Sequence, residues 1–156
     1  MHVRSAVDAD RTDVLAIAER LVSFGPTTRT AAEIVRGERR ALDAALRGVS
    51  PGSELFVATD EQSRVLGVLL METRTDYFTQ ESHAHVSILA VAQGAEGRGI
   101  GSALLDHAET WARARGFRRL TLAVFTNNER AKALYARCGW RPELETYFKT
   151  LSDRQE

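Results

Sequence analysis

The sequence predicts one mixed α/β (α+β) domain over residues 1–156. Three observations indicate it. Segments with period-two and with helical spacing of apolar residues alternate along the chain. A glycine-rich loop leads directly from an apolar strand into an amphipathic helix. The length is that of one ordinary domain, and no linker, repeat or low-complexity tract interrupts it. With 44% hydrophobic and 27% charged residues, the composition is that of a globular protein.

The first half of the chain is expected to contain three strands and two helices. Asp8 or Asp10 caps the first helix, and the turn cluster at 50–53 ends the second. A polar turn at 60–63 joins two later strands into a hairpin. The predicted elements are a strand at 2–6, helices at about 8–22 and 30–47, and strands at 55–59 and 65–73.

The second half is expected to alternate strands with helices. Gly116 and Gly139 follow the two helical patterns and end them. The predicted elements are a central strand at 84–92, a helix at about 100–115, a strand at 118–125, a helix at 128–138, and extended segments at 140–142 and 147–151. The total is about six to seven strands and about four helices, followed by a polar tail from about residue 152.

Charge and cysteine content exclude several classes of function. Lysine plus arginine equals aspartate plus glutamate, 21 against 21, whereas nucleic-acid binding usually shows as a basic excess, although a local basic patch is compatible with this composition. A lone cysteine, Cys138, forms neither a disulfide framework nor a cysteine-based zinc site, so we expect no metal. Residues 1–5 lack the apolar core of a signal peptide, and no apolar run approaches the roughly 18 residues of a membrane span. We therefore expect a cytoplasmic protein without nucleic-acid or membrane partners.

The loop at 93–101 is predicted to bind phosphate. Gly97, Gly99 and Gly101 allow the backbone to turn tightly just where a helix begins. The first N–H groups of a helix lack internal partners and carry a partial positive charge, which suits phosphate oxygens. Arg98 adds a full charge. A P-loop would need Gly-Lys-Ser/Thr here, and a dinucleotide-binding loop would need glycine where Ser102 stands. A sharp turn without a ligand is the alternative.

Two motifs carry a resemblance to a known family. The run Glu96–Leu105 resembles motif A of the GCN5-related N-acetyltransferase (GNAT) superfamily, and Asn127–Trp140 resembles its motif B. The resemblance implies the GNAT acyl-CoA N-acyltransferase fold, with a strongly curved mixed sheet. It also implies acetyl-CoA as donor substrate and an amine-bearing small molecule or peptide as acceptor. Glu96 departs from motif A, because the family prefers arginine or glutamine at that position.

The resemblance also assigns donor-site residues. Backbone groups of Leu89 and Val91 would bind the thioester carbonyl and the pantetheine amides. Tyr135 would protonate the leaving thiolate, or would only pack in its helix. Asn127 would contact the pantetheine arm or cap the helix that follows. The pyrophosphate would lie against the loop residues Glu96, Gly97, Arg98, Gly99, Ile100, Gly101 and Ser102.

The motifs specify the general base and the acceptor site less fully than the donor site. His85 stands where several family members carry a glutamate base, and an imidazole with a pKa of about 6.5 suits that role; an ordinary solvated or hydrogen-bonded histidine is the alternative. Period-two spacing puts His85, Ser87, Leu89 and Val91 on one face of their strand. Candidate acceptor contacts are Phe24 and Arg29 on one connection and Tyr77 and Phe78 on another loop.

Three functions are compatible with these patterns. The first is an active N-acetyltransferase, in which a primary amine attacks acetyl-CoA directly in a ternary complex. The second is a catalytically silent acyl-CoA-binding sensor or regulatory domain, and the third is a nucleotide-phosphate binder unrelated to coenzyme A. Dimerisation is common in the GNAT superfamily, so a homodimer is also considered.

Overall fold

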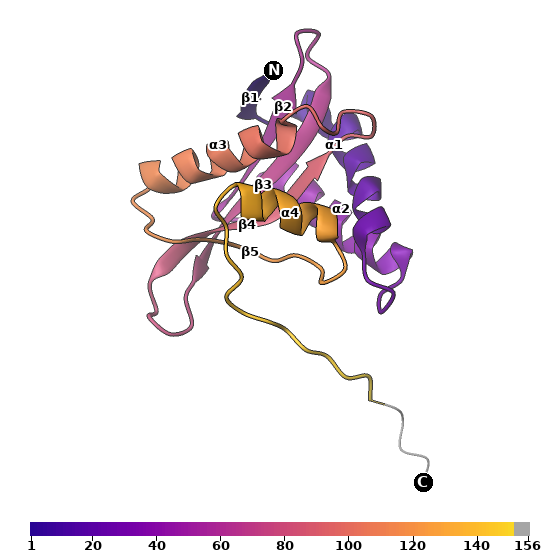
Figure 1. Cartoon of the computed structure of the whole chain (residues 1–156). Helices are drawn as coiled ribbons and strands as arrows, with labels where there is room; N and C mark the ends of the chain where they lie inside the picture. The colour runs from indigo at the N-terminus through magenta and orange to yellow at the C-terminus, as the bar shows by residue number, and fades with distance from the viewer. Residues whose placement is uncertain (152–156) are drawn as a thin grey trace.

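The computed structural model describes residues 1–151 and contains a five-stranded sheet with helices on both faces (Figure 1). The strands are β1 (His2–Ser5), β2 (Ser53–Thr59), β3 (Val65–Thr75), β4 (Ser82–Val91) and β5 (Leu120–Leu122). The α-helices are α1 (Arg11–Ala18), α2 (Ala31–Leu46), α3 (Ile100–Ala114) and α4 (Glu129–Arg137), and the 3-10 helices are η1 (Asp8–Asp10) and η2 (Glu19–Phe24).

The strands follow one another across the sheet in the order β1-β2-β3-β4-β5. Neighbours are antiparallel except β4 and β5, which are parallel. A parallel pair needs a crossover connection, and α3 provides it. The mixed α/β class predicted from the sequence is therefore confirmed, with a mixed curved sheet.

Apolar side chains fill two layers, one on each face of the sheet. Alternate residues of β3 serve opposite layers: Leu69 and Met71 pack toward α3, whereas Val68 and Leu70 pack toward α1 and α2. The helix α2 begins at a capping box, in which Thr30 Oγ1 accepts from Glu33 N at 3.2 Å and Glu33 Oε2 accepts from Thr30 N at 2.7 Å. Across residues 1–151, no helix has both the length and the apolar character needed to cross a bilayer.

A β-bulge interrupts β4 at Ser87. Leu70 of β3 pairs with Ile88 and Met71 pairs with Val86, which leaves Ser87 unopposed. A bulge of this kind reverses the side-chain alternation beyond it. Ala84 and Val86 accordingly pack on the α3 side, while Ile88 and Ala90 pack on the side of α1 and α2.

The bulge corrects one expectation from the sequence. Leu89 and Val91 face α3, but His85 lies on the opposite face, next to neither of them. The prediction assumed that side chains alternate between the two faces of the sheet without interruption along the strand. The extra residue at the bulge breaks this alternation.

The strand count is also lower than predicted. Residues 118–125 form only the three-residue β5, and the extended segments expected after α4 pair with no strand among the described residues. Residues 141–151 are all exposed and run away from the sheet (Figure 1). A strand exists only where a partner ladder is present, so strand propensity alone did not produce one here. The predicted polar tail from residue 152 lies outside the described residues.

Candidate functional site

The glycine-rich loop connects β4 to α3 and opens toward solvent. Gly97 and Gly99 have φ angles of 74° and 77°, in the left-handed region that favours glycine. A Cβ placed on either residue would meet nothing within 4 Å. Gly99 is the N-cap of α3 and offers no capping side chain. The first N–H groups of a 15-residue helix therefore have no side-chain cap, which suits an anion site.

Packing against the sheet fixes the start of α3. Ile100 and Leu104 are buried in the α3-side layer. A Cβ on Gly67 of β3 would lie 3.0 Å from Ile100 Cγ2 and from Leu104 Cδ1, so this glycine lets the helix approach closely. Because the Ile100 side chain is in the core, only its backbone remains for a ligand.

The two sequence motifs meet where α3 and α4 pack. A Cβ on Gly101 would lie 2.9 Å from Leu134 Cδ2 of α4. One residue on, Ser102 Oγ lies 3.8 Å from Cys138 Sγ. The small residues of motif A therefore allow motif B to lie beside it.

Glu96 is neutralised by a residue that sequence analysis missed. Its carboxylate pairs with Arg20 of η2 and accepts from Gly94 N at 2.7 Å. Arg20 is mostly buried, with its guanidinium 5.6 Å from the centre of the Phe24 ring. This ion pair offsets the negative charge of Glu96 beside the loop. No local signal in the sequence connects residues 20 and 96.

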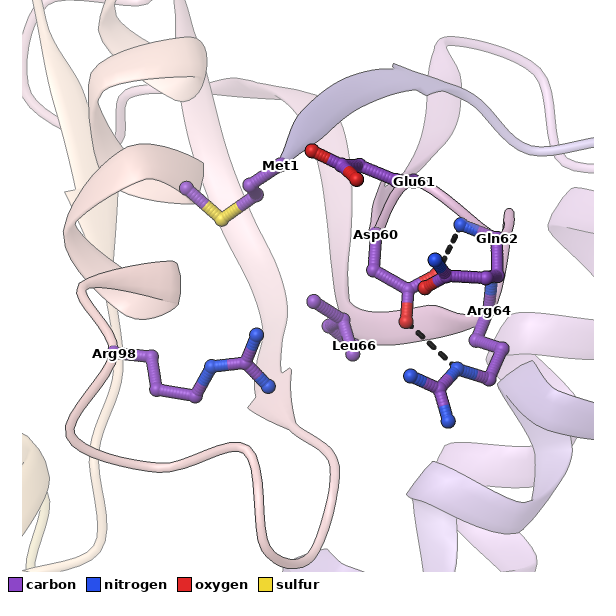
Figure 2. Close-up of a pocket in the computed structure, with 7 residues that line it drawn as sticks. All are labelled: Met1, Asp60, Glu61, Gln62, Arg64, Leu66 and Arg98. Atoms are coloured by element: carbon purple, nitrogen blue, oxygen red, sulfur yellow. Dashed lines mark hydrogen bonds and ion pairs between the residues drawn. The ribbon is translucent and has the colours of Figure 1, made fainter.

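Arg98 lies at the rim of a pocket of about 260 Å³ between the loop and the β2–β3 hairpin (Figure 2). Asp60 in the same pocket is already bound to Arg64, with Oδ2 accepting from Arg64 Nε at 2.7 Å. Arg98 is exposed, and within residues 1–151 no carboxylate forms an ion pair with it. Its charge is therefore available to an anion at the loop.

The sheet opens between β4 and β5 beyond the bulge. The parallel ladder joins residues 84–86 to β5 and extends no further. Ala92 N donates to Leu66 O on the β3 side at 2.8 Å. Successive residues of a strand direct their N–H and C=O groups to opposite sides. The peptide groups of Leu89 and Val91 therefore point away from β3, to the side on which no strand of the described chain pairs with them. The opening leads to the glycine-rich loop.

Tyr135 projects from α4 and is half-buried. Its ring centre lies 6.2 Å from that of Trp140, and burial raises the pKa of its phenol. The phenol therefore stays protonated at neutral pH and is able to donate a proton.

The helix α4 is capped by Asn128 rather than by Asn127: Asn128 Oδ1 accepts from Ala131 N at 3.1 Å. Asn127 Nδ2 instead donates to Gly25 O at 3.1 Å.

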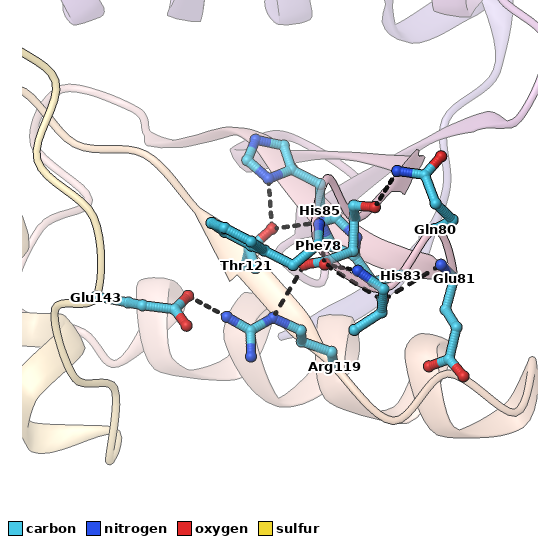
Figure 3. Close-up of polar contacts among 10 residues, drawn as sticks. Phe78, Gln80, Glu81, His83, His85, Arg119, Thr121 and Glu143 are labelled. Atoms are coloured by element: carbon cyan, nitrogen blue, oxygen red, sulfur yellow. Dashed lines mark hydrogen bonds and ion pairs between the residues drawn. The ribbon is translucent and has the colours of Figure 1, made fainter.

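His85 is buried and bound to β5. Its Nδ1 lies 2.8 Å from Thr121 Oγ1, and His83 Nε2 lies 3.1 Å from the same oxygen (Figure 3). The hydroxyl has one proton, so it donates to one imidazole and accepts from the other. Burial is the main cause that lowers the pKa of His85 to about 4, and the positive charge of Arg74 lowers it further. The negative charge of Glu72 raises it, but by less. The expectation of an imidazole with an ordinary pKa is therefore wrong.

Lowering the pH from 7 to 4 is expected to reduce the free energy of unfolding by at most about 3 kcal/mol through His85. Its pKa in the folded protein, about 4, lies below the unfolded value of 6.5. As the pH falls, the unfolded chain binds a proton first. The contribution of neutral His85 is complete above pH 6.5 and is lost toward pH 4. Urea denaturation at several pH values measures it.

His85→Asn is the control for this prediction, because the amide keeps a hydrogen-bonding group near Thr121 but does not titrate. Burial also lowers the pKa of His107, and that contribution is present in both proteins. The difference between the two pH profiles isolates His85. Parallel profiles would contradict the prediction.

The comparison with known families decides the identity of the fold. A family model described as "Acetyltransferase (GNAT) family" matches residues 25–140, which is more than half of the chain. The chain belongs to the GNAT family. The family resemblance drawn from motifs A and B is therefore confirmed.

Individual relatives agree with this assignment. The mycothiol acetyltransferase of Beutenbergia cavernae is 47% identical over 57 residues, which are 36% of this chain and 19% of that protein. The chain thus matches about a fifth of this curated relative's length. A putative acetyl transferase of Pyrococcus furiosus has a TM-score of 0.77 at 24% identity, covering 96% of this chain and 99% of the other. An aminoglycoside 6'-N-acetyltransferase of Acinetobacter haemolyticus has a TM-score of 0.70 at 16% identity, covering 98% and 100%. These two solved structures show the shared fold.

The candidate acceptor residues of this GNAT member lie in two separate places. Phe24 lies at the end of η2, and Arg29 is exposed on the connection to α2. Tyr77 and Phe78 are 83% and 78% exposed on the β3–β4 loop, with their rings edge to face at 5.2 Å. No hydrogen bond or ion pair between described residues joins these two loops.

Gly25 is a further residue that the sequence did not single out. Its carbonyl holds Asn127, and a Cβ there would lie 2.2 Å from Ile34 Cδ1. The α1–α2 connection therefore lies beside the start of α4. No group of three His, Cys, Asp or Glu side chains in residues 1–151 is arranged to hold a metal ion.

Proposed function

We propose that this chain is an acetyl-CoA-dependent N-acetyltransferase acting as one domain on a primary amine. One observation carries the proposal: the opening between β4 and β5 exposes the backbone of Leu89 and Val91 and leads to the uncapped start of α3. Pantetheine amides can pair with an unpaired strand edge as a further strand would. A pyrophosphate suits a helix N-terminus. One elongated ligand with both groups therefore fits the two adjacent features.

The proposed reaction is direct attack in a ternary complex. The amine nitrogen attacks the thioester carbon, a C–N bond forms, and the C–S bond breaks as the tetrahedral intermediate collapses. Backbone N–H groups near Leu89 would stabilise the oxyanion. Tyr135 would donate its phenol proton to the leaving thiolate. The products are the N-acetylated acceptor and coenzyme A.

We propose His85 as the group on the acceptor side that takes up the amine proton. Its Nδ1 is engaged by Thr121, which leaves Nε2 for the acceptor or for a bridging water. A base with a pKa of about 4 holds a proton only briefly at neutral pH. The proton would therefore pass on to solvent.

The test combines acetyl-CoA calorimetry with an assay for free thiol. The amine panel contains a polyamine, an amino acid, an aminoglycoside and a peptide. The aminoglycoside is included because one structural neighbour named above is an aminoglycoside 6'-N-acetyltransferase. We expect micromolar binding and thiol release with at least one amine. Absence of binding at millimolar acetyl-CoA would sink the proposal.

A silent acyl-CoA sensor is the second candidate, favoured by one observation. His85, the candidate general base, is buried, neutral and bound to Thr121, which makes it a weak base. A sensor would bind acetyl-CoA as tightly as an enzyme. It would release no thiol with any amine.

A further inference from the structure

Arg20 of η2 carries a buried charge that the proposed reaction does not use. Its side chain is only 20% exposed, and its Nε has no hydrogen-bond partner within residues 1–151. Burying a guanidinium with an unmet donor costs free energy. An unmet buried donor in a folded protein calls for an explanation.

The ion pair between Arg20 and Glu96 differs from the other ion pairs of the described chain. It is the only one in residues 1–151 in which both side chains are less than a quarter exposed, at 20% and 23%. Desolvation offsets much of the attraction in such a pair, whereas removal of one partner leaves an uncompensated charge. The effect of the pair is therefore expected on the position and charge of the groups that it joins, more than on stability.

Glu96 uses its two carboxylate oxygens to join η2 to the backbone of the glycine-rich loop. Oε1 accepts from Arg20, and Oε2 accepts from Gly94 N at 2.7 Å. Gly94 has a φ of 79°, and Ala95 N donates to Ala92 O at 3.1 Å. The first part of the loop is therefore fixed as far as Glu96.

The part of the loop after Glu96 is held only by its two ends. The N–H groups of Gly97, Arg98 and Gly99 donate no hydrogen bond to another group of residues 1–151. The helix α3 begins directly after them, and the core fixes its start. The position of Glu96 therefore influences where these N–H groups point, and binding of a pyrophosphate depends on that direction.

The charge of Glu96 also lies next to the proposed anion site. Consecutive Cα atoms are about 3.8 Å apart, so an unpaired carboxylate at this position would repel a pyrophosphate bound at Gly97. Arg20 supplies the compensating charge. The Phe24 ring, whose centre lies 5.6 Å from the guanidinium, helps to hold Arg20 in place.

We propose that Arg20 is a positioning residue of the donor site, which acts on the glycine-rich loop through Glu96. It holds the Glu96 carboxylate on Gly94 N and cancels its charge beside the pyrophosphate. This role requires no contact between Arg20 and the ligand. The inference rests on the proposed function, because acetyl-CoA is the ligand whose affinity Arg20 is expected to raise.

Acetyl-CoA calorimetry on three variants tests the proposal. Arg20→Met leaves the carboxylate unpaired and is expected to raise the Kd about tenfold. Glu96→Gln leaves the guanidinium unpaired near the pyrophosphate and is expected to lower the Kd about threefold. The double variant is expected to return to within about threefold of the wild type, because the new amide oxygen still accepts from Gly94 N and no unpaired charge remains.

The matched control is Arg39→Met. Arg39 Nη1 lies 3.4 Å from Glu19 Oε1 of η2, and both side chains are exposed, at 46% and 65%. Loss of this pair is expected to leave the Kd unchanged. Three results overturn the proposal: an Arg20→Met variant that binds like the wild type, two single variants that weaken binding alike, and a double variant as weak as Arg20→Met. The second would show that the pair only packs η2, and the third that Arg20 does not act through Glu96.

Hydrogen exchange without acetyl-CoA separates this inference from the proposed function. The amides of Gly94 and Ala95 are expected to exchange faster in Arg20→Met, because an unpaired carboxylate turns toward water and releases Gly94 N. The double variant is expected to restore slow exchange. A wild type that binds no acetyl-CoA refutes the proposed function, but exchange that still depends on Arg20 leaves its hold on the loop established. Exchange that Arg20→Met does not change overturns the inference, whatever the wild type binds.

Discussion

Replacing Gly99 with glutamate is expected to weaken acetyl-CoA binding about 100-fold or more, as measured by calorimetry. The new carboxylate stands at the start of α3, where the proposed pyrophosphate would lie, and like charges in contact repel strongly away from bulk water. A 100-fold loss corresponds to about 2.7 kcal/mol. An acidic residue at a helix N-terminus stabilises the helix itself. Unfolding of α3 is therefore not the cause of the expected loss.

Gly94→Glu is the matched control. Gly94 lies in the same loop with a φ of 79°, close to the 77° of Gly99, and a Cβ at either position has open space. Each substitution therefore introduces similar backbone strain, about 1–2 kcal/mol. Only Gly99 adjoins the first turn of α3. Equal losses of affinity in the two variants would show that strain in the loop, and not charge at the helix, weakens binding.

Features with a local physical cause were predicted well from the sequence. The helix expected at about 30–47 is α2 at Ala31–Leu46, and the one expected at about 100–115 is α3 at Ile100–Ala114. A capping box begins α2, and Gly116, with a φ of 75°, follows α3. Such signals depend on a few neighbouring residues and need no knowledge of the fold.

The face on which His85 lies could not be predicted, because it depends on the pairing of two strands. Ser87 becomes a bulge only in register with Leu70 and Met71 of β3. One extra residue then moves His85 to the opposite face from Leu89, where burial and Arg74 lower its pKa. The chemical character of the residue thus follows from a register that composition does not encode.

The charge partner of Glu96 could not be predicted from the sequence either. In the sequence it is an acidic residue in a loop expected to hold phosphate. In the structure its carboxylate is paired with Arg20, which lies 76 positions earlier in the chain. The resulting neutral pair removes the electrostatic conflict at the loop. Only the packing of η2 beside the loop reveals the partner.

Tyr135→Phe is expected to lower kcat about 100-fold while the KM for acetyl-CoA stays within about twofold, the lower end of the range for general acid catalysis. The effect is expected at that lower end because burial raises the phenol pKa above 10, whereas a thiol has a pKa of about 8.5. Proton transfer to the thiolate is then uphill by at least about 2 kcal/mol. Steady-state kinetics with a saturating amine measures both constants.

The control for this substitution is Tyr147→Phe. Its hydroxyl is exposed and donates only to Glu145 Oε2, at 2.8 Å. It should leave kcat and KM unchanged, since the aromatic ring is retained. If Tyr135→Phe also leaves kcat within twofold, Tyr135 packs against Trp140 without donating a proton. The thiolate would then leave unprotonated, which its own pKa permits near neutral pH, and the reaction would depend on the backbone groups of β4 alone.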